Sequence, residues 1–450
     1  MKISSVFNRE PIGDVPETEV ADLKEIIEKA ENFIATLDSG PSKPVTDLLL
    51  NSIKALDAKA DNITRLLSAE TGMPLRLASM SFQRFLESLS VRTEVYEPGN
   101  RSGGTCGSPR GQFSFSIDYT VGIVVAITSF SDPLGSLSRI LFPALAARVP
   151  VVIKPSSSAV LSVLSVIQTL QRSGLQEGAI QAVIARRSSA AVEQLLLNRN
   201  VSMVFAAGSP ASFLALQEKH PLGTRAFELY SSSTALVLHA SDLDLAASAI
   251  AGSFTRFQGQ APGRIQRVLV DSDSFDYLVN RISEELMRMK AGDPSDRSTD
   301  ISRLSNQAKE EEFASISIGK FGSAAAILYG GGIKDGIPVP LVLEYTEARK
   351  ELWEKDVMLP LLIVRRFSSS GEAISIANSI ASRWCSYAYT DDLNDLNLLS
   401  SRLDFGRIYV NSLDTYWPGG QTFISGYTGA NGKGIQGISL LRRREVQVEY

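Results

Sequence analysis

At 450 residues the chain is too long for one hydrophobic core, and its 44% apolar content predicts a globular protein of two α/β domains. The net charge of −4 provides no general basic field for nucleic acid, and two cysteines with two histidines argue against a disulfide framework, a metal centre or a Ser-His-Asp triad. No signal-like segment opens the sequence, and its longest apolar runs, such as residues 121–127, fall far short of the roughly 20 residues of a membrane helix. We therefore expect a cytoplasmic protein with no metal site and no nucleic-acid or membrane partner.

The N-terminal part of the chain has helical periodicity. Residues 18–92 are predicted to form three amphipathic helices, because apolar residues such as those between Leu48 and Ile63 recur at intervals of three and four. Gly72 and Pro74 are expected to end that helix. Residues 98–111 are rich in Gly, Ser and Pro and predict a linker.

Strand patterns follow. Residues 113–119 alternate strictly between apolar and polar, which predicts a half-exposed strand, and residues 445–450 alternate in the same way. Residues 120–227 alternate short apolar strands with helices, which is typical of a parallel, doubly wound sheet. The strands are predicted at 122–127, 150–153, 181–184 and 202–205, and the helices at 134–147, 159–173 and 190–197. Residues 228–420 show a second α/β pattern.

One segment carries a recognisable motif. It is Gly259-Gln260-Ala261-Pro262-Gly263-Arg264-Ile265-Gln266-Arg267-Val268-Leu269-Val270. The segment resembles, without a gap, the G-Q-x-C-x-x-x-x-R-V-L-V that carries the catalytic cysteine of NAD(P)-dependent aldehyde dehydrogenases. Further matches follow in the order of that family: ETGMPL at 70–75, VVIKPS at 151–156, FEL at 227–229, GDP at 292–294 and VNS at 410–412.

The resemblance implies an aldehyde dehydrogenase-like α/β fold. In that architecture a Rossmann-type, doubly wound NAD(P)-binding domain occupies residues 1–103 and 120–227, and a second α/β catalytic domain occupies 228–420. An oligomerisation arm is expected at 104–119 and 421–450. The resemblance therefore implies a homo-oligomer, dimer or tetramer, or a hetero-oligomer with a related subunit.

The reacting centre departs from the family pattern. Pro262 stands where the family has its nucleophilic cysteine, and proline supplies neither a thiol nor a backbone N–H for an oxyanion. Ser131 replaces the oxyanion asparagine, and Asp132 beside it brings a negative charge. Glu228 is retained at the position of the general base, although a glutamate after an apolar strand is more often only a charged strand end. Tyr230 stands at a glycine position and is expected to fill part of the nicotinamide or aldehyde pocket.

Two cysteines remain as possible substitutes. Cys106 lies in the predicted linker, and Cys385 lies on a predicted strand of the second domain, where a small core residue is the favoured interpretation. We do not expect either to act as a replacement nucleophile.

The dinucleotide positions are better preserved. Lys154 matches the lysine that reaches the adenosine ribose, although a strand-terminal lysine with no ligand is the alternative. Ser157 stands where NAD-preferring members often carry a glutamate that repels a 2′-phosphate. Arg186 and Arg187 could pair with that phosphate, or could equally be solvated, so NADP tolerance is a hypothesis. Gly208 and Ser209 survive in the phosphate loop.

The nicotinamide-side motif E-I-F-G-P is placed at residues 351–355. There Glu351 keeps the ribose contact, and Trp353 replaces the phenylalanine. The adenosine half of the site is thus expected to be the better preserved half.

Two functions remain open. The first is a catalytically inactive, aldehyde dehydrogenase-like protein that binds NAD(P) and serves as a partner or scaffold. The alternative is an active NAD(P)-linked oxidoreductase that works without a thiol, with Glu228 as its base.

Overall fold

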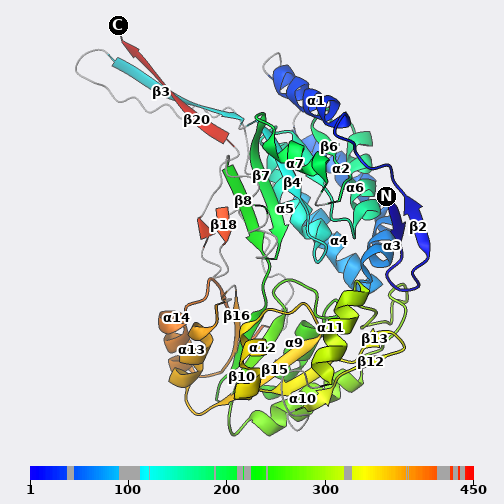
Figure 1. Cartoon of the computed structure of the whole chain (residues 1–450). Helices are drawn as coiled ribbons and strands as arrows, with labels where there is room; N and C mark the ends of the chain where they lie inside the picture. Colours follow the sequence, from blue (N-terminus) through cyan, green and yellow to red (C-terminus); the bar gives the residue numbers. More distant parts are fainter. Residues whose placement is uncertain are drawn as a thin grey trace.

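The computed structural model describes residues 1–37, 45–90, 112–120, 122–186, 189–209, 216, 224–239, 242–318, 327–381, 383, 385–412, 426–428, 434–435 and 441–449. An antiparallel pair opens the chain and four helices follow it: β1 (Lys2–Ser4), β2 (Pro11–Asp14), α1 (Asp22–Leu37), α2 (Val45–Asp57), α3 (Ala60–Thr71) and α4 (Leu75–Ser90). Two large sheets then form the upper and lower parts of the molecule in Figure 1.

The first sheet has the strand order β19-β18-β8-β7-β4-β5-β6. All of its pairs are parallel except β18 with β19. Its strands are β4 (Ile123–Ile127), β5 (Val151–Lys154), β6 (Ile180–Ala182), β7 (Val201–Gly208), β8 (Thr224–Leu229), β18 (Gly426–Thr428) and β19 (Gly434–Ile435). The helices between them are α5 (Pro133–Ala146), α6 (Val160–Arg172) and α7 (Ala190–Leu197).

Helices cover both faces of this sheet, which is why its central strands are apolar throughout. Val124 and Ala126 of β4 join an apolar cluster with residues of α3 to α6. Their neighbours Ile123 and Val125 point to the opposite face and join a cluster with residues of α1 and α7. Asp132 caps α5, since its carboxylate accepts the Gly135 N–H at 3.1 Å and Pro133 follows it.

The second sheet has the strand order β11-β14-β15-β10-β9-β16-β17. Its strands are β9 (Ser233–Val237), β10 (Ile265–Asp271), β11 (Ile327–Gly330), β14 (Leu341–Glu344), β15 (Leu361–Phe367), β16 (Ser386–Tyr389) and β17 (Ile408–Val410). The other elements of this part are α9 (Leu243–Thr255), α10 (Phe275–Met287), α11 (Gln307–Ser317), β12 (Ile333–Lys334), β13 (Ile337–Pro338), the 3-10 helix η2 (Glu347–Arg349), α12 (Lys350–Glu354), α13 (Ser370–Ser379) and α14 (Leu393–Arg402).

A two-stranded ribbon projects from this body in Figure 1. It consists of β3 (Gln112–Thr120) and β20 (Leu441–Glu449), which pair antiparallel along their whole length. The two alternating segments of the sequence thus pair with each other. The range 421–450, predicted as one arm, is divided, because β18 pairs with β8 in the first sheet while β20 forms the ribbon.

The predicted α/β fold is confirmed, and the strands and helices predicted within 120–227 are present with ends shifted by no more than three residues. The prediction of three helices in residues 18–92 was wrong. The helix expected across Leu48 to Ile63 is broken between α2 and α3, where the Lys59 N–H donates to the Leu56 carbonyl in a tight turn. Gly72 does end α3, in the left-handed conformation at φ 76°.

Candidate functional site

The cleft lies at the carboxyl edge of the first sheet. After β4 the chain adds β5 and β6 on one side and then returns to place β7 and β8 on the other, so the strand order reverses between β4 and β7. Ligands of doubly wound sheets bind outside the strand ends at such a reversal. A cleft of about 280 Å³ lies there. Its described lining is Ile127, Thr128, Ser129, Phe130, Ser131, Lys154, Ser156, Ser157, Val192, Ala206, Ala207, Gly208, Ser209, Leu216, Tyr230 and Met358.

Four of the predicted cofactor residues meet in this cleft. Lys154 ends β5 and is almost wholly buried, and Ser157 is exposed at the rim. Gly208 and Ser209 line the cleft from the end of β7. Arg187 lies outside the described residues. Their assembly follows from topology, because parallel strands deliver their carboxyl ends to one edge.

The N-terminus of α6, which follows Lys154, already holds an anion. The buried Glu70 carboxylate of α3 accepts the backbone N–H groups of Leu161 at 2.6 Å and Ser162 at 2.8 Å. Burial raises the pKa of Glu70 above its ordinary value, while these N–H groups act in the opposite direction. A phosphate in the cleft therefore has to be held by other groups, of which the end of β7 is the nearest candidate.

A chain of buried polar groups closes the other end of the cleft. Ser131 is buried, and its hydroxyl lies 2.9 Å from that of Ser129. The Asp132 carboxylate lies 3.3 Å from both terminal nitrogens of Arg139, and Arg139 in turn donates a hydrogen bond to the Tyr230 hydroxyl. The Tyr230 N–H donates to the Gly208 carbonyl at 2.8 Å. Tyr230 is therefore fixed at both its backbone and its side chain.

Pro262 is buried and is not among the described residues that line the cleft. Its loop is pinned by backbone contacts, since the Gly263 N–H donates to the Ser231 carbonyl at 3.0 Å. Gly259 is left-handed at φ 70°, and a Cβ there would lie 1.9 Å from the Leu359 carbonyl oxygen, so only glycine fits.

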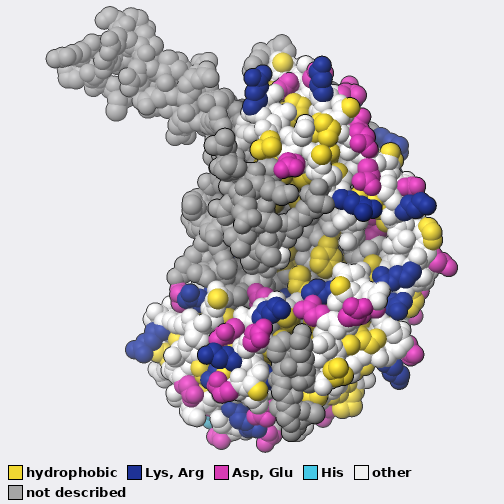
Figure 2. Space-filling view, in the orientation of Figure 1, with side chains coloured by type: hydrophobic (Ala, Val, Ile, Leu, Met, Phe, Trp, Pro, Cys, Tyr) yellow, Lys and Arg dark blue, Asp and Glu magenta, His cyan; other side chains and the backbone are white. Residues whose placement is uncertain are grey.

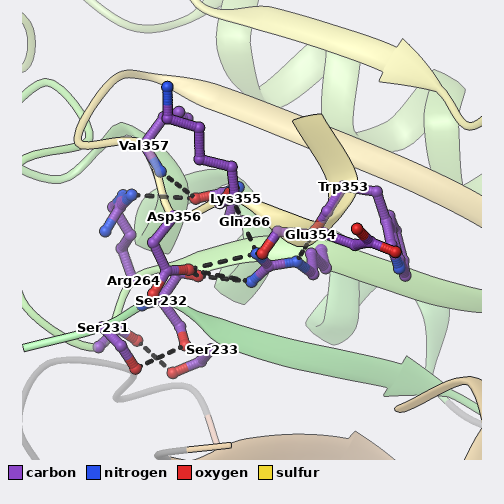
Figure 3. Close-up of polar contacts among 12 residues, drawn as sticks. Ser231, Ser232, Ser233, Arg264, Gln266, Trp353, Glu354, Lys355, Asp356 and Val357 are labelled. Carbon is purple, nitrogen blue, oxygen red and sulfur yellow. Dashed lines mark hydrogen bonds and ion pairs between the residues drawn. The ribbon is translucent and has the colours of Figure 1, made fainter. Parts of the chain in front are cut away.

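Figure 3 shows a buried network that joins three segments around this loop. Arg267 is fully buried and donates to the Ser232 hydroxyl at 2.6 Å and to the Asp356 carboxylate at 3.2 Å. It also donates to three consecutive carbonyls, those of Trp353, Glu354 and Lys355. The guanidinium thus ties the Ser232 turn and the 353–356 segment to β10.

A second arginine lies in the same network with fewer partners. Arg264 is 2% exposed and donates to the Gln266 side chain at 3.1 Å, but its Nε has no hydrogen-bond partner. Burial lowers the pKa of Arg264 to about 10, although the carboxylate of Asp356 raises it in part. Burial also lowers the pKa of Arg267. Two arginines thus share one described carboxylate, that of Asp356, whose side chain is 24% exposed.

The structure does not bring Glu351 and Trp353 to the cleft. Glu351 is exposed on α12, and Trp353 is buried in the core of the second sheet, with its ring centroid 5.4 Å from that of Tyr345. Met358 lines the cleft instead. The sequence offered a signal for this placement, because Asp356-Val357-Met358-Leu359-Pro360 aligns with E-I-F-G-P without a gap and keeps its proline. The nicotinamide-side motif therefore corresponds better to 356–360 than to 351–355.

Glu228 and the cysteines complete the predicted set. Glu228 lies on β8 opposite Ala207, a residue of the cleft, and the structure describes its backbone alone. Cys106 lies outside the described residues. Cys385 is confirmed as a core residue, 2% exposed, with its Sγ 2.7 Å from the Ser233 hydroxyl.

Alkylation by iodoacetamide at pH 8 should leave Cys385 unmodified in the folded protein. Burial raises its pKa from 9.0 to about 11, which lowers the thiolate fraction about 100-fold before access is considered. Mass spectrometry of the native and the urea-unfolded protein measures this. Equal modification rates in the two samples would contradict the buried position.

Within the described residues no helix is long and apolar enough to cross a membrane. On the face drawn in Figure 2, Lys and Arg lie interspersed with Asp and Glu rather than gathered in one basic field.

The chain is similar to known proteins along most of its length. Residues 1–434 match the model of the Aldehyde dehydrogenase family. The 3-sulfolactaldehyde dehydrogenase of Priestia aryabhattai is 24% identical over 423 residues, which cover 92% of this chain and 87% of that relative.

Two solved structures share the fold. The NADP-dependent glyceraldehyde-3-phosphate dehydrogenase from Bacillus halodurans C-125, complexed with NADP, superposes with a TM-score of 0.88 at 22% identity over 100% of this chain and 95% of its own. The glyceraldehyde-3-phosphate dehydrogenase GapN from Methanocaldococcus jannaschii, also complexed with NADP, gives a TM-score of 0.89 at 21% identity, with 100% and 99% covered.

Proposed function

Because this chain belongs to the aldehyde dehydrogenase family, we propose that it is an NAD(P)-binding member that has lost thiol-dependent aldehyde oxidation and serves as a partner or scaffold subunit. The observation that carries the proposal is Pro262. It stands at the cysteine position of the ungapped motif and is buried, and it is not among the described residues lining the cleft.

The loss of activity follows from what Pro262 and its neighbours lack. Proline has no nucleophilic atom, and it has no backbone N–H to hold an oxyanion. Losing one such donor typically costs about 10²–10³ in rate, before the missing nucleophile is counted. Ser131 is shorter than the asparagine it replaces, and its hydroxyl is already 2.9 Å from that of Ser129.

Retention of a dinucleotide site is supported by the lining of the cleft. Lys154 supplies a cation and Ser156 and Ser157 supply hydroxyls, while no described residue of the lining is acidic. The two solved relatives named above are NADP complexes. A 2′-phosphate meets no glutamate at Ser157, so NADP is expected to be accepted along with NAD.

Calorimetric titration of the purified protein with NADP and NAD tests this proposal. We expect micromolar binding of NADP. The variant Ser157→Glu should weaken NADP about tenfold by charge repulsion at the rim while leaving NAD nearly unchanged. If neither nucleotide binds the wild-type protein, the dinucleotide part of the proposal fails and only the scaffold role is left.

A second candidate is an NAD(P)-linked oxidoreductase that uses Glu228 as its base without a thiol. It is favoured by the register of β8, which puts Glu228 opposite Ala207 of the cleft. Aldehyde turnover that survives thiol alkylation but is lost in Glu228→Gln would establish this function. Absence of any such turnover supports the inactive reading.

The scaffold role rests on the β3–β20 ribbon, which projects from the body in Figure 1 and offers two open strand edges. We propose that it pairs with a second subunit, either another copy of this chain in a dimer or tetramer, or a related chain.

A further inference from the structure

Tyr230 divides the cleft into an open and a closed end. Its ring is 5% exposed, its hydroxyl accepts a hydrogen bond from Arg139, and the Arg139 guanidinium carbon lies 5.8 Å from the ring centroid. Arg139 is itself buried and paired with buried Asp132. Because Asp132 also caps α5, the side chain of Tyr230 is anchored to a helix as well as to β7.

The space beyond Tyr230 is filled by apolar side chains. Tyr230 belongs to one continuous apolar cluster with Phe257 and Ala261, and Phe130 packs on Phe257 with ring centroids 5.8 Å apart. Phe257 and Ala261, on the segment that leads to Pro262, are not among the described residues that line the cleft. The position at which a nicotinamide ring would meet an aldehyde is therefore occupied by packed protein.

The opposite end of the cleft remains open and suits a nucleoside phosphate. Lys154, Ser156 and Ser157 offer a cation and hydroxyls to ribose and phosphate oxygens, and Val192 with Leu216 offers an apolar surface to a flat purine. The N-terminus of α6 is taken by Glu70, so it does not compete for the phosphate.

We infer that the cleft recognises an adenine nucleotide by its adenosine and phosphate groups alone and gains no affinity from a nicotinamide ring. The inference rests on the proposed dinucleotide site and narrows its ligand to the class of adenosine phosphates. A nicotinamide ring could enter only by displacing Tyr230 from its hydrogen bond to a charged partner, a loss worth about 10- to 100-fold in affinity.

Calorimetry of the full-length protein can compare each dinucleotide with its own adenosine half. NADP is paired with adenosine 2′,5′-bisphosphate, NAD is paired with ADP, and nicotinamide mononucleotide is titrated alone. We expect each pair to agree within about threefold, and no heat from the mononucleotide. A dinucleotide that binds more than about tenfold tighter than its adenosine half would overturn the inference and leave the proposed dinucleotide site intact. No binding of any compound would sink both.

Two variants at Tyr230 sharpen the test. Tyr230→Ala removes the ring and should create a preference of at least about tenfold for NADP over adenosine 2′,5′-bisphosphate. Tyr230→Phe keeps the ring in the apolar cluster, so its ratio should stay near one. Binding of the bisphosphate shows in each case that the protein is folded. An unchanged ratio in a folded Tyr230→Ala protein would contradict the role assigned to the tyrosine.

Discussion

Replacing Arg267 by methionine is expected to lower the free energy of unfolding by about 3–5 kcal/mol. The methionine keeps the apolar stem of the side chain but leaves Asp356, Ser232 and three backbone carbonyls without their shared donor. For domains of this size the loss corresponds to a fall in Tm on the order of 10 °C or more. Urea and thermal unfolding of the two proteins measure it.

Arg264→Met provides the matched control, since the same chemical change is made three residues away. Arg264 has an unpartnered Nε and contributes the second positive charge beside Asp356, so its removal should be neutral or slightly stabilising. Its partner Gln266 still accepts the Val357 N–H at 3.0 Å. Equal effects of the two substitutions would show that the network in Figure 3 does not divide the work as described.

The double variant Pro262→Cys, Ser131→Asn is expected to show NADP-dependent aldehyde oxidation within about tenfold of the wild-type background. Both lost groups are nominally restored, including a backbone N–H worth about 10²–10³ in rate in an open site. The loop of residue 262 is buried, however, and Tyr230 separates it from the cleft. A thiol placed there meets neither the aldehyde nor the cofactor.

Adding Tyr230→Gly to the double variant should produce the larger gain, at least about 100-fold over the double variant, because it removes the side chain that closes the site. NADPH formation measured by absorbance, with the Tm of each variant as a check on folding, decides the comparison. Strong activity in the double variant alone would refute both the closed site and the proposed inactivity.

The layered fold could be predicted because hydrophobic periodicity is a local property. Strands buried on both faces have continuous apolar sequence, as in residues 151–153, and the intervening helices have their own spacing. The break between α2 and α3 was missed for the same reason. Apolar spacing continues across Ala58 and Lys59, and neither glycine nor proline marks the turn.

The candidate site was predictable where motifs sit at strand ends. Lys154, Ser157, Gly208 and Ser209 each follow or end a strand, and sheet topology then brings them into one cleft. Glu351 and Trp353 were misplaced because a short helix, α12, precedes the segment that returns to the cleft. The locally similar E-L-W matched better by composition than the correctly spaced Asp356 to Pro360.

The buried charges could not be predicted at all. Arginine is seldom fully buried, so Arg264 and Arg267 have no sequence signature as core residues. Their burial depends on Asp356 and on carbonyls about 90 residues away along the chain. The contact between Arg139 and Tyr230 likewise spans 91 residues.

The strand that carries Glu228 also sets a condition on how the protein is made. Its outer edge pairs with β18, whose residues follow the entire second sheet in the chain. During synthesis, β8 therefore presents an open row of N–H and carbonyl groups while roughly 200 residues are still being added. Nascent or prematurely terminated chains should consequently aggregate through this edge, and chaperone dependence is expected to end only when residues 426–435 have left the ribosome.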